Sequence, residues 1–178
     1  MPAELIPGYW LRSGSGLDRA KLLKFLHRTY AELYPDRELG HLAQTVEHYF
    51  SKQTPVWWVE CQKNSSEGEE IFPALPSQHL NPKSQVQNLN SVVGCLWLGN
   101  AIDQTTGSRH AHIFLLYIAP EHRRRGLGAA LVIHAENWAR LRGDMQIGLQ
   151  VFLSNQPAMN LYQKLGYQSH SVWMVKSL

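Results

Sequence analysis

The chain has 178 residues, of which 44% are hydrophobic and 17% charged, with a formal net charge of +3. This composition provides enough apolar material for one packed domain over residues 1–178, and it excludes a disordered chain. No segment approaches the roughly 18 uninterrupted apolar residues of a membrane span, and no basic cluster precedes an apolar run at the start, so we expect a cytoplasmic protein without a membrane partner.

The first third of the chain predicts strands and helices in alternation. A short strand is expected near residues 9–12. Apolar residues at spacings of three and four between Asp18 and Pro35 then mark an amphipathic helix that ends before the proline. A second helix should cover about 39–50. The branched and aromatic residues of 56–61 predict another strand.

A long polar segment at about 62–90 reads as an extended excursion from a strand hairpin. Its prolines at 73, 76 and 82 disfavour regular structure, and loops of this length are uncommon and usually functional or mobile. Its apolar residues could pack on the body of the domain or on another subunit. A homodimer therefore stays open as one arrangement.

The second half of the chain alternates strands with helices. Strands are expected at 92–102, 110–119, 147–153 and 171–175, and helices at 126–141 and 157–165. Glycines at 143 and 166 end the two helices. The order predicts a mixed α/β domain built around one central sheet.

The most informative segment follows the strand that ends at Pro120. A tight loop with two glycines opens directly into a helix, whose first turn has unpaired backbone N–H groups and a partial positive charge that bind anions. Arg123, Arg124 and Arg125 add donors that are always protonated. The pattern predicts a pyrophosphate site, with a solvated basic helix start as the alternative.

Other anion-binding and metal-binding patterns do not fit. The loop lacks the Gly-Lys-Ser/Thr ending of a P-loop, and Gly126-x-Gly128 is not followed by the third glycine of a dinucleotide fingerprint. One short basic patch without interleaved aromatic residues predicts no nucleic-acid partner. The nine histidines show no metal-ligand spacing, so no metal site is expected.

Two segments carry patterns in a specific order. The first is Ile118-x-Pro120-x-x-Arg123-x-x-Gly126-x-Gly128-Ala129, and the second is Asn155-x-x-Ala158-x-x-Leu161-Tyr162-x-x-Leu165-Gly166-Tyr167. Together they resemble the pyrophosphate-binding motif and the second cofactor motif of the GNAT superfamily of acyl-CoA dependent N-acetyltransferases. The N-terminal half agrees with that family only in the order of its elements.

This resemblance implies a fold, a cosubstrate and a reaction. The fold is a single, mostly antiparallel central sheet of six to seven strands flanked by helices, with two splayed parallel strands. The cosubstrate is acetyl-CoA, and no metal takes part. The reaction is transfer of the acetyl group to a primary amine of a small molecule, protein or peptide, by direct attack in a ternary complex. A non-catalytic acyl-CoA-binding sensor of the same fold is the alternative.

The resemblance also implies roles for individual residues. The backbone at 116–118 would meet the acetyl and pantetheine end, the amides at 124–129 would hold the pyrophosphate, and Asn155 would bond the pantetheine arm. The implied cofactor-binding residues are Leu116, Tyr117, Ile118, Arg123, Arg124, Arg125, Gly126, Leu127, Gly128, Ala129, Asn155, Ala158 and Tyr162. Tyr162 is also the implied catalytic residue, because a phenol can donate to the sulfur that leaves with negative charge. A tyrosine that merely packs on the sheet is the alternative.

The general base is the weakest part of this assignment. Many family members have a glutamate where this chain has Gln150, and an amide cannot accept the proton. His110, His112, Glu60 and Glu121 are the remaining candidates, along with a water chain to bulk solvent. A weak base suits an α-amine, with a pKa of about 8, better than a lysine, with a pKa of about 10.4.

Overall fold

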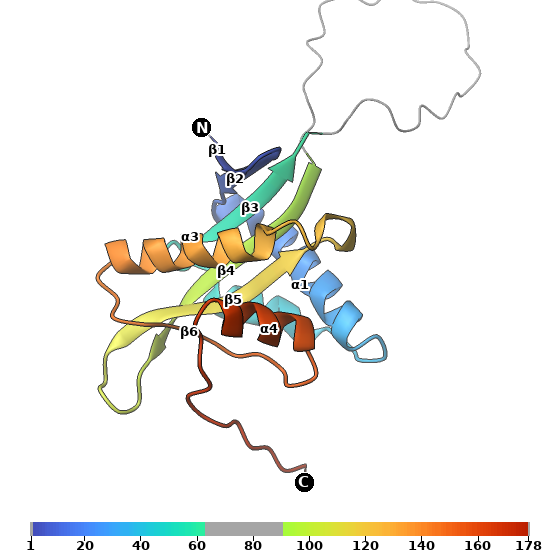
Figure 1. Ribbon diagram of the computed structural model, residues 1–178. Coiled ribbons are helices and arrows are strands. Elements are labelled where there is room, and N and C mark those ends of the chain that lie inside the picture. Colours follow the sequence, from blue (N-terminus) through green and yellow to red (C-terminus); the bar gives the residue numbers. More distant parts are fainter. Residues whose placement is uncertain (1, 63–90, 178) are drawn as a thin grey trace, which may run out of the picture.

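The computed structural model describes residues 2–62 and 91–177 (Figure 1). Its strands are β1 (Ala3–Ile6), β2 (Tyr9–Ser13), β3 (Val56–Cys61), β4 (Ser91–Ile102), β5 (Arg109–Ile118) and β6 (Ile147–Leu149), and its helices are α1 (Arg19–Leu33), α2 (His41–Tyr49), α3 (Leu127–Leu141) and α4 (Gln156–Lys164). Within these ranges no helix is long and apolar enough to cross a bilayer. The polar segment predicted to extend from a hairpin at about 62–90 lies outside the described residues, except for its first residue.

The strands form one sheet in the order β1-β2-β3-β4-β5-β6. Every neighbouring pair is antiparallel except β5 and β6, which run parallel and are joined in the sequence by a connection that contains α3. A parallel pair needs a crossover connection, and a helix is the usual one. The predicted mixed and mostly antiparallel sheet with one parallel pair is confirmed.

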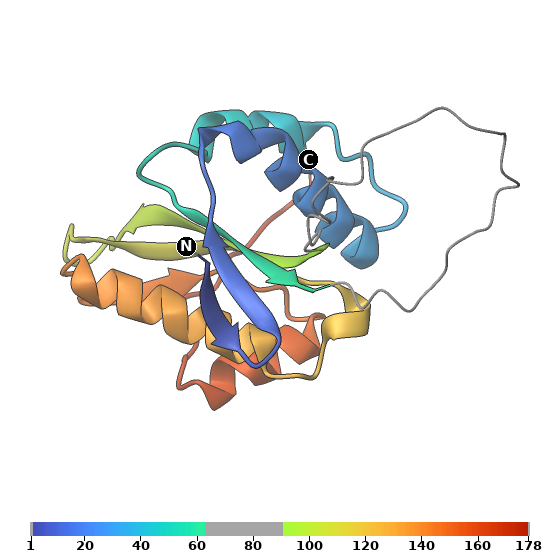
Figure 2. The same ribbon diagram turned by 90° about the horizontal axis from the view of Figure 1, so that it is seen from above.

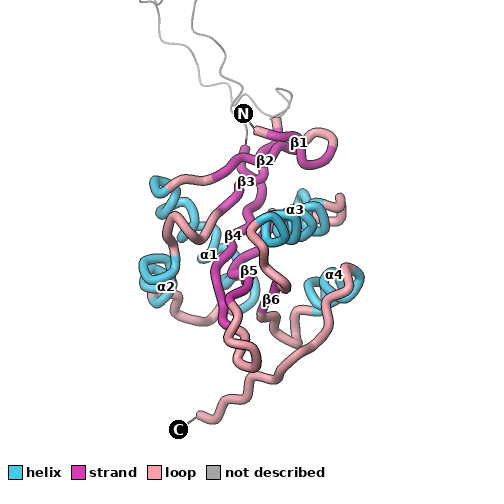
Figure 3. Tube along the Cα trace, turned by 90° about the vertical axis from the view of Figure 1, so that its left-hand side faces the viewer, coloured by secondary structure: helices cyan, strands magenta, loops and turns pink. Residues whose placement is uncertain are grey.

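Helices cover both faces of the sheet, with α1 and α2 on one face and α3 and α4 on the other (Figures 2 and 3). Successive side chains of a strand point to opposite faces, and the pair Trp57-Trp58 shows the consequence. Trp58 packs against Phe25 of α1 with ring centroids 5.4 Å apart. Trp57 packs against His134 of α3 at 4.8 Å. Strand β3 therefore contributes side chains to two apolar cores, one on each face of the sheet.

A β-bulge interrupts the pairing of β4 with β5. Ile113 pairs with Leu98 and Leu115 pairs with Trp97, so Phe114 has no partner across the ladder. A bulge bends its strand and increases the local twist. The parallel pairing with β6 ends at the same point, since its last pair is Ile113 with Leu149.

The parallel strands consequently separate beyond the bulge. The strand predicted at 147–153 ends at Leu149, because the chain then leaves β5 and loses its ladder partner. The longer β5 continues to Ile118 without a neighbour on this side among the described strands. The splayed arrangement implied by the family resemblance is present.

Both ends of the chain differ from the sequence-based expectation. The strand predicted at 171–175 is wrong: this segment is irregular, and the side chains of Val172, Trp173, Met174 and Val175 are 77–88% exposed. Strand propensity alone does not hold an extended segment that has no ladder partner. Conversely, β1 was not expected, and it pairs with β2 across a turn at Gly8, whose φ is +81°.

Gly99 of β4 allows the bulged Phe114 to lie flat on the sheet. A Cβ at this position would stand 1.9 Å from Cε2 of the Phe114 ring, which also packs on Trp97 at 4.9 Å. We therefore expect Gly99→Ala to lower the free energy of unfolding by about 1–3 kcal/mol, as overpacked cores do. Urea unfolding measures this loss, and Gly40→Ala, with open space around its Cβ, is the control. Equal stability of the two variants would contradict the prediction.

Candidate functional site

The main chain at the end of β5 faces the gap left by β6. The N–H of Ala119 donates to a carbonyl of β4 at 2.8 Å. Alternate residues of a strand direct their main-chain groups to opposite neighbours. Tyr117 therefore faces β4, whereas Leu116 and Ile118 direct their N–H and C=O groups into the gap. An extended ligand with amide groups can bind this edge as another strand would.

The loop after β5 is shaped to present backbone N–H groups. Arg124 has a φ of +63° and Gly126 a φ of +87°, both in the left-handed region. Gly126 is the N-cap of α3 and provides no side-chain cap, so the first N–H groups of α3, from Leu127 to Ala129, have no acceptor among the described residues. Such a concave run of donors at a helix N-terminus binds an anion.

The two glycines of the loop have different roles. Gly126 supplies the left-handed backbone, with open space where a Cβ would stand. A Cβ on Gly128 would stand 3.2 Å from Cδ2 of Leu161, so this glycine lets α4 approach the first turn of α3. The two sequence motifs are thereby brought together at one end of the gap.

The three consecutive arginines have different surroundings. Arg123 donates from Nε to the carbonyl of Ile118 at 2.7 Å and from Nη2 to Glu32 of α1 at 2.6 Å. Arg125 donates to the hydroxyl of Tyr9 at 3.0 Å. Arg124 is exposed and has no side-chain partner among the described residues. Arg123 and Arg125 therefore hold the loop, and the guanidinium of Arg124 is free to meet a ligand.

Tyr9 links the loop to β2, a contact that the sequence did not indicate. Its hydroxyl accepts from Arg125 and lies 3.0 Å from Nδ1 of His122, with the two rings edge to face at 5.7 Å. The hydroxyl of Tyr9 therefore contacts two side chains of the loop at once. The loop is thus tied to β2 through Tyr9 and to α1 through Glu32.

Helix α4 contributes the second set of residues. Oδ1 of Asn155 caps the helix by accepting from the N–H of Ala158 at 3.3 Å, which leaves the amide N–H₂ of Asn155 available as a donor. Tyr162 is 8% exposed and packs in the same apolar cluster as Ile118 and Leu127. Its hydroxyl has no hydrogen-bond partner among the described residues. Burial raises the pKa of Tyr162 to about 12, so the phenol stays protonated at neutral pH and can donate a hydrogen bond.

The candidate bases lie away from the gap. Gln150 is exposed just after β6. Burial and the neighbouring His110 lower the pKa of His112, which is neutral at pH 7, but His112 is four positions before Leu116 on β5, about 13 Å along a strand. Glu121 is exposed on the loop.

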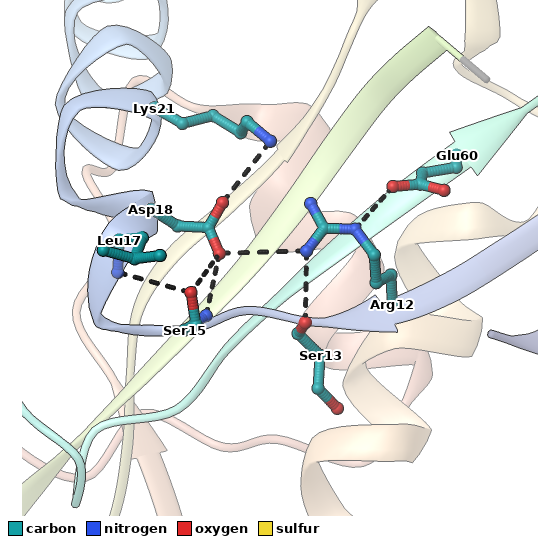
Figure 4. Close-up of polar contacts among 7 residues, drawn as sticks. All are labelled: Arg12, Ser13, Ser15, Leu17, Asp18, Lys21 and Glu60. Atoms are coloured by element: carbon teal, nitrogen blue, oxygen red, sulfur yellow. Dashed lines mark hydrogen bonds and ion pairs between the residues drawn. The ribbon is translucent and has the colours of Figure 1, made fainter. Parts of the chain in front are cut away.

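Glu60 is paired, and two strand positions separate it from β5. Arg12 donates from Nε to its carboxylate at 2.6 Å, and the same arginine lies 3.8 Å from Asp18 (Figure 4). We therefore assign the role of general base to none of the four candidates named from the sequence.

Comparison with known proteins places these features in a family. The model of the acetyltransferase (GNAT) family matches residues 22–167. Streptothricin acetyltransferase of Streptomyces lavendulae is 33% identical over 67 residues, which are 38% of this chain and 35% of that enzyme, so the match spans about a third of that relative. The uncharacterized N-acetyltransferase YycN of Bacillus subtilis is 27% identical over 144 residues, which are 78% of this chain and 91% of that protein.

A solved structure shares the fold. The predicted acetyltransferase of Clostridium acetobutylicum, solved with acetyl-CoA, superposes with a TM-score of 0.66 at 15% identity, and the alignment covers 95% of this chain and 96% of that one. At this identity the likeness concerns the arrangement of the elements and not the substrate.

Proposed function

The chain belongs to the acetyltransferase (GNAT) family, and on this premise we propose that it transfers the acetyl group of acetyl-CoA to a primary amine of a small molecule, protein or peptide. The supporting observation is the gap between β5 and β6, which has unpaired main-chain groups along one side and an anion-binding helix N-terminus at its end. A ligand with amides, a thioester and a diphosphate matches both parts.

The cosubstrate would be held mainly by main-chain groups. The N–H and C=O of Leu116 and the N–H of Ile118 would pair with the pantetheine amides. The amides from Arg124 to Ala129 would bind the diphosphate, and the free side-chain N–H₂ of Asn155 would donate to the pantetheine arm. Binding through the backbone explains why few side chains of the loop are needed as ligands.

The chemical step is a direct displacement through a tetrahedral intermediate. The amine nitrogen forms a bond to the thioester carbon, the C–S bond breaks, and the sulfur leaves with the electron pair. The free hydroxyl of Tyr162 would donate a hydrogen bond to this sulfur. With a pKa of about 12 for Tyr162 and about 8.5 for a thiol, full proton transfer is uphill by about 5 kcal/mol, so the tyrosine stabilises the charge and need not give up its proton.

The ammonium proton of the acceptor would leave through water. No described candidate base adjoins the gap, and a water chain can carry the proton from the amine to solvent. Amines that are already partly neutral near pH 7 then react faster. We therefore propose that α-amines and other amines of low pKa are better acceptors than lysine side chains.

Thiol release from acetyl-CoA tests the proposed function. We expect binding of coenzyme A in calorimetry, and release of free thiol when acetyl-CoA is mixed with a panel that includes streptothricin, a peptide α-amine and a lysine peptide blocked at its N-terminus. Gln150, in the place of the common glutamate, favours a second candidate, a non-catalytic acyl-CoA-binding module. That candidate predicts the same heat of binding with no thiol release, whereas absence of both signals contradicts the two together.

A further inference from the structure

One carboxylate joins three parts of the molecule that are far apart in the sequence. Glu32 lies in the last turn of α1, and its two oxygens accept from different donors. The hydroxyl of Tyr117 in β5 donates to Oε1 at 2.9 Å, and Nη2 of Arg123 in the loop donates to Oε2 at 2.6 Å. Glu32 belongs to neither sequence motif.

Both donors act on the stretch of main chain that faces the gap. Tyr117 lies between Leu116 and Ile118, so the position of its ring fixes the strand at these residues. Arg123 also donates to the carbonyl of Ile118, and its guanidinium lies 5.7 Å from the centre of the Tyr117 ring. A shift of the carboxylate would therefore move the strand end and the start of the anion-binding loop together.

The surroundings make this carboxylate hard to replace. The ring of Tyr117 is buried, and burial together with the bond to Glu32 raises the pKa of Tyr117 to about 12, so its hydroxyl keeps the proton that it donates to Glu32 at neutral pH. Charge-assisted hydrogen bonds are stronger than neutral ones. No second acid on α1 could take over, because Glu32 is the only acidic residue of this helix.

We propose that Glu32 is a positioning residue for acetyl-CoA, which holds the end of β5 and the pyrophosphate loop in register from the opposite face of the sheet. The inference rests on the proposed function. Helix α1 lies across the sheet from α3 and α4, which carry both cofactor motifs (Figure 3). Glu32 never touches the cosubstrate and acts through Tyr117 and Arg123.

The test compares variants that keep the shape of the side chain. Glu32→Gln retains the size but not the charge, and Glu47→Gln on α2 removes one charge from an exposed residue with no side-chain partner in the described structure. We expect Glu32→Gln to raise the Kd for coenzyme A and the KM for acetyl-CoA about three- to tenfold, with kcat and the KM for the amine within about twofold. Glu47→Gln should match the wild type in all four constants.

A double variant separates positioning from general stability. If Glu32 acts through Tyr117, the effects of Glu32→Gln and Tyr117→Phe are not independent. The fold-increase in Kd of the double variant should then be smaller than the product of the fold-increases of the two single variants. An unchanged Kd in Glu32→Gln would overturn the inference, and so would a tighter one, which would mean that release of Arg123 aids binding. The inference would also be overturned if, across all variants, the Kd for coenzyme A rose in step with the loss of the midpoint temperature of thermal unfolding, because general instability would then explain the weaker binding. Normal constants for Glu32→Gln leave the proposed function intact, whereas a wild type that binds no coenzyme A contradicts both.

Discussion

Replacing Tyr162 by phenylalanine is expected to lower kcat for acetyl transfer about 10- to 100-fold, and to leave the KM for acetyl-CoA within about twofold. The ring fills the same space in the apolar cluster, so the change removes only the hydroxyl. This hydroxyl has no partner among the described residues, and its loss leaves no buried group unpaired. Steady-state kinetics with the best amine of the panel measures the effect.

Tyr167→Phe is the matched control for this prediction. The ring of Tyr167 lies 5.5 Å from that of Tyr162, and the control makes the same chemical change in the same cluster. We expect its kcat to stay near the wild-type value. Equal kcat values for Tyr162→Phe and the wild type, with similar stability in urea, would show that Tyr162 only packs on the sheet.

The pKa of Tyr162 gives this residue a pH signature. A phenol with a pKa of about 12 remains a donor up to that pH, so Tyr162 causes no loss of kcat between pH 8 and 10. Over the same range a larger share of the acceptor amine becomes neutral, and the rate rises. A fall in kcat near pH 10 that disappears in Tyr162→Phe would contradict the raised pKa.

The elements that carry the two motifs could be predicted because their signals are local. The glycines after Pro120, the apolar spacing of α3 and the proline in the first turn of α4 each act within a few residues. The family resemblance implied the parallel pair. Local patterns therefore predicted the loop and both helices, but the predicted sheet lacked β1, extended β6 beyond Leu149 and included a strand at 171–175 that the structure does not have.

Contacts between distant residues could not be predicted from the same signals. Tyr9 and Arg125 are 116 positions apart, and Glu32 and Arg123 are 91 positions apart. A single sequence contains no pattern that pairs them. The bulge at Phe114 was likewise hidden, because the alternation of side chains breaks only when the register with β4 is known. The segment 171–175 failed for the opposite reason, since its strand-forming residues lack a neighbour.

The arginine run shows how much the structure adds to a correct motif. The sequence predicted three equivalent donors around a pyrophosphate. In the structure, the flanking arginines turn to Glu32 and Tyr9, and the middle one stays exposed on a left-handed backbone. Two of the three arginines therefore hold the loop, and we propose that the third meets the diphosphate.

This division leads to the second large expected effect, in Arg124→Glu. We expect the Kd for coenzyme A to rise about 30- to 100-fold, because the change removes a charge-assisted donor and places a negative charge beside the diphosphate. Arg124 has no described side-chain contact to lose, so the free energy of unfolding should change little. Isothermal titration calorimetry at two salt concentrations measures the effect, which should shrink at the higher concentration.

Arg109→Glu separates this local effect from a change in net charge. Arg109 begins β5 at the end of the strand away from the loop, and it is exposed, so the variant makes the same charge change without facing the anion site. Its Kd should stay within about twofold of the wild type. The flanking Arg123→Gln and Arg125→Gln should weaken binding less than Arg124→Glu and should lower stability more, because they loosen the loop. An Arg124→Glu variant that binds coenzyme A as tightly as Arg109→Glu would mean that the diphosphate lies elsewhere.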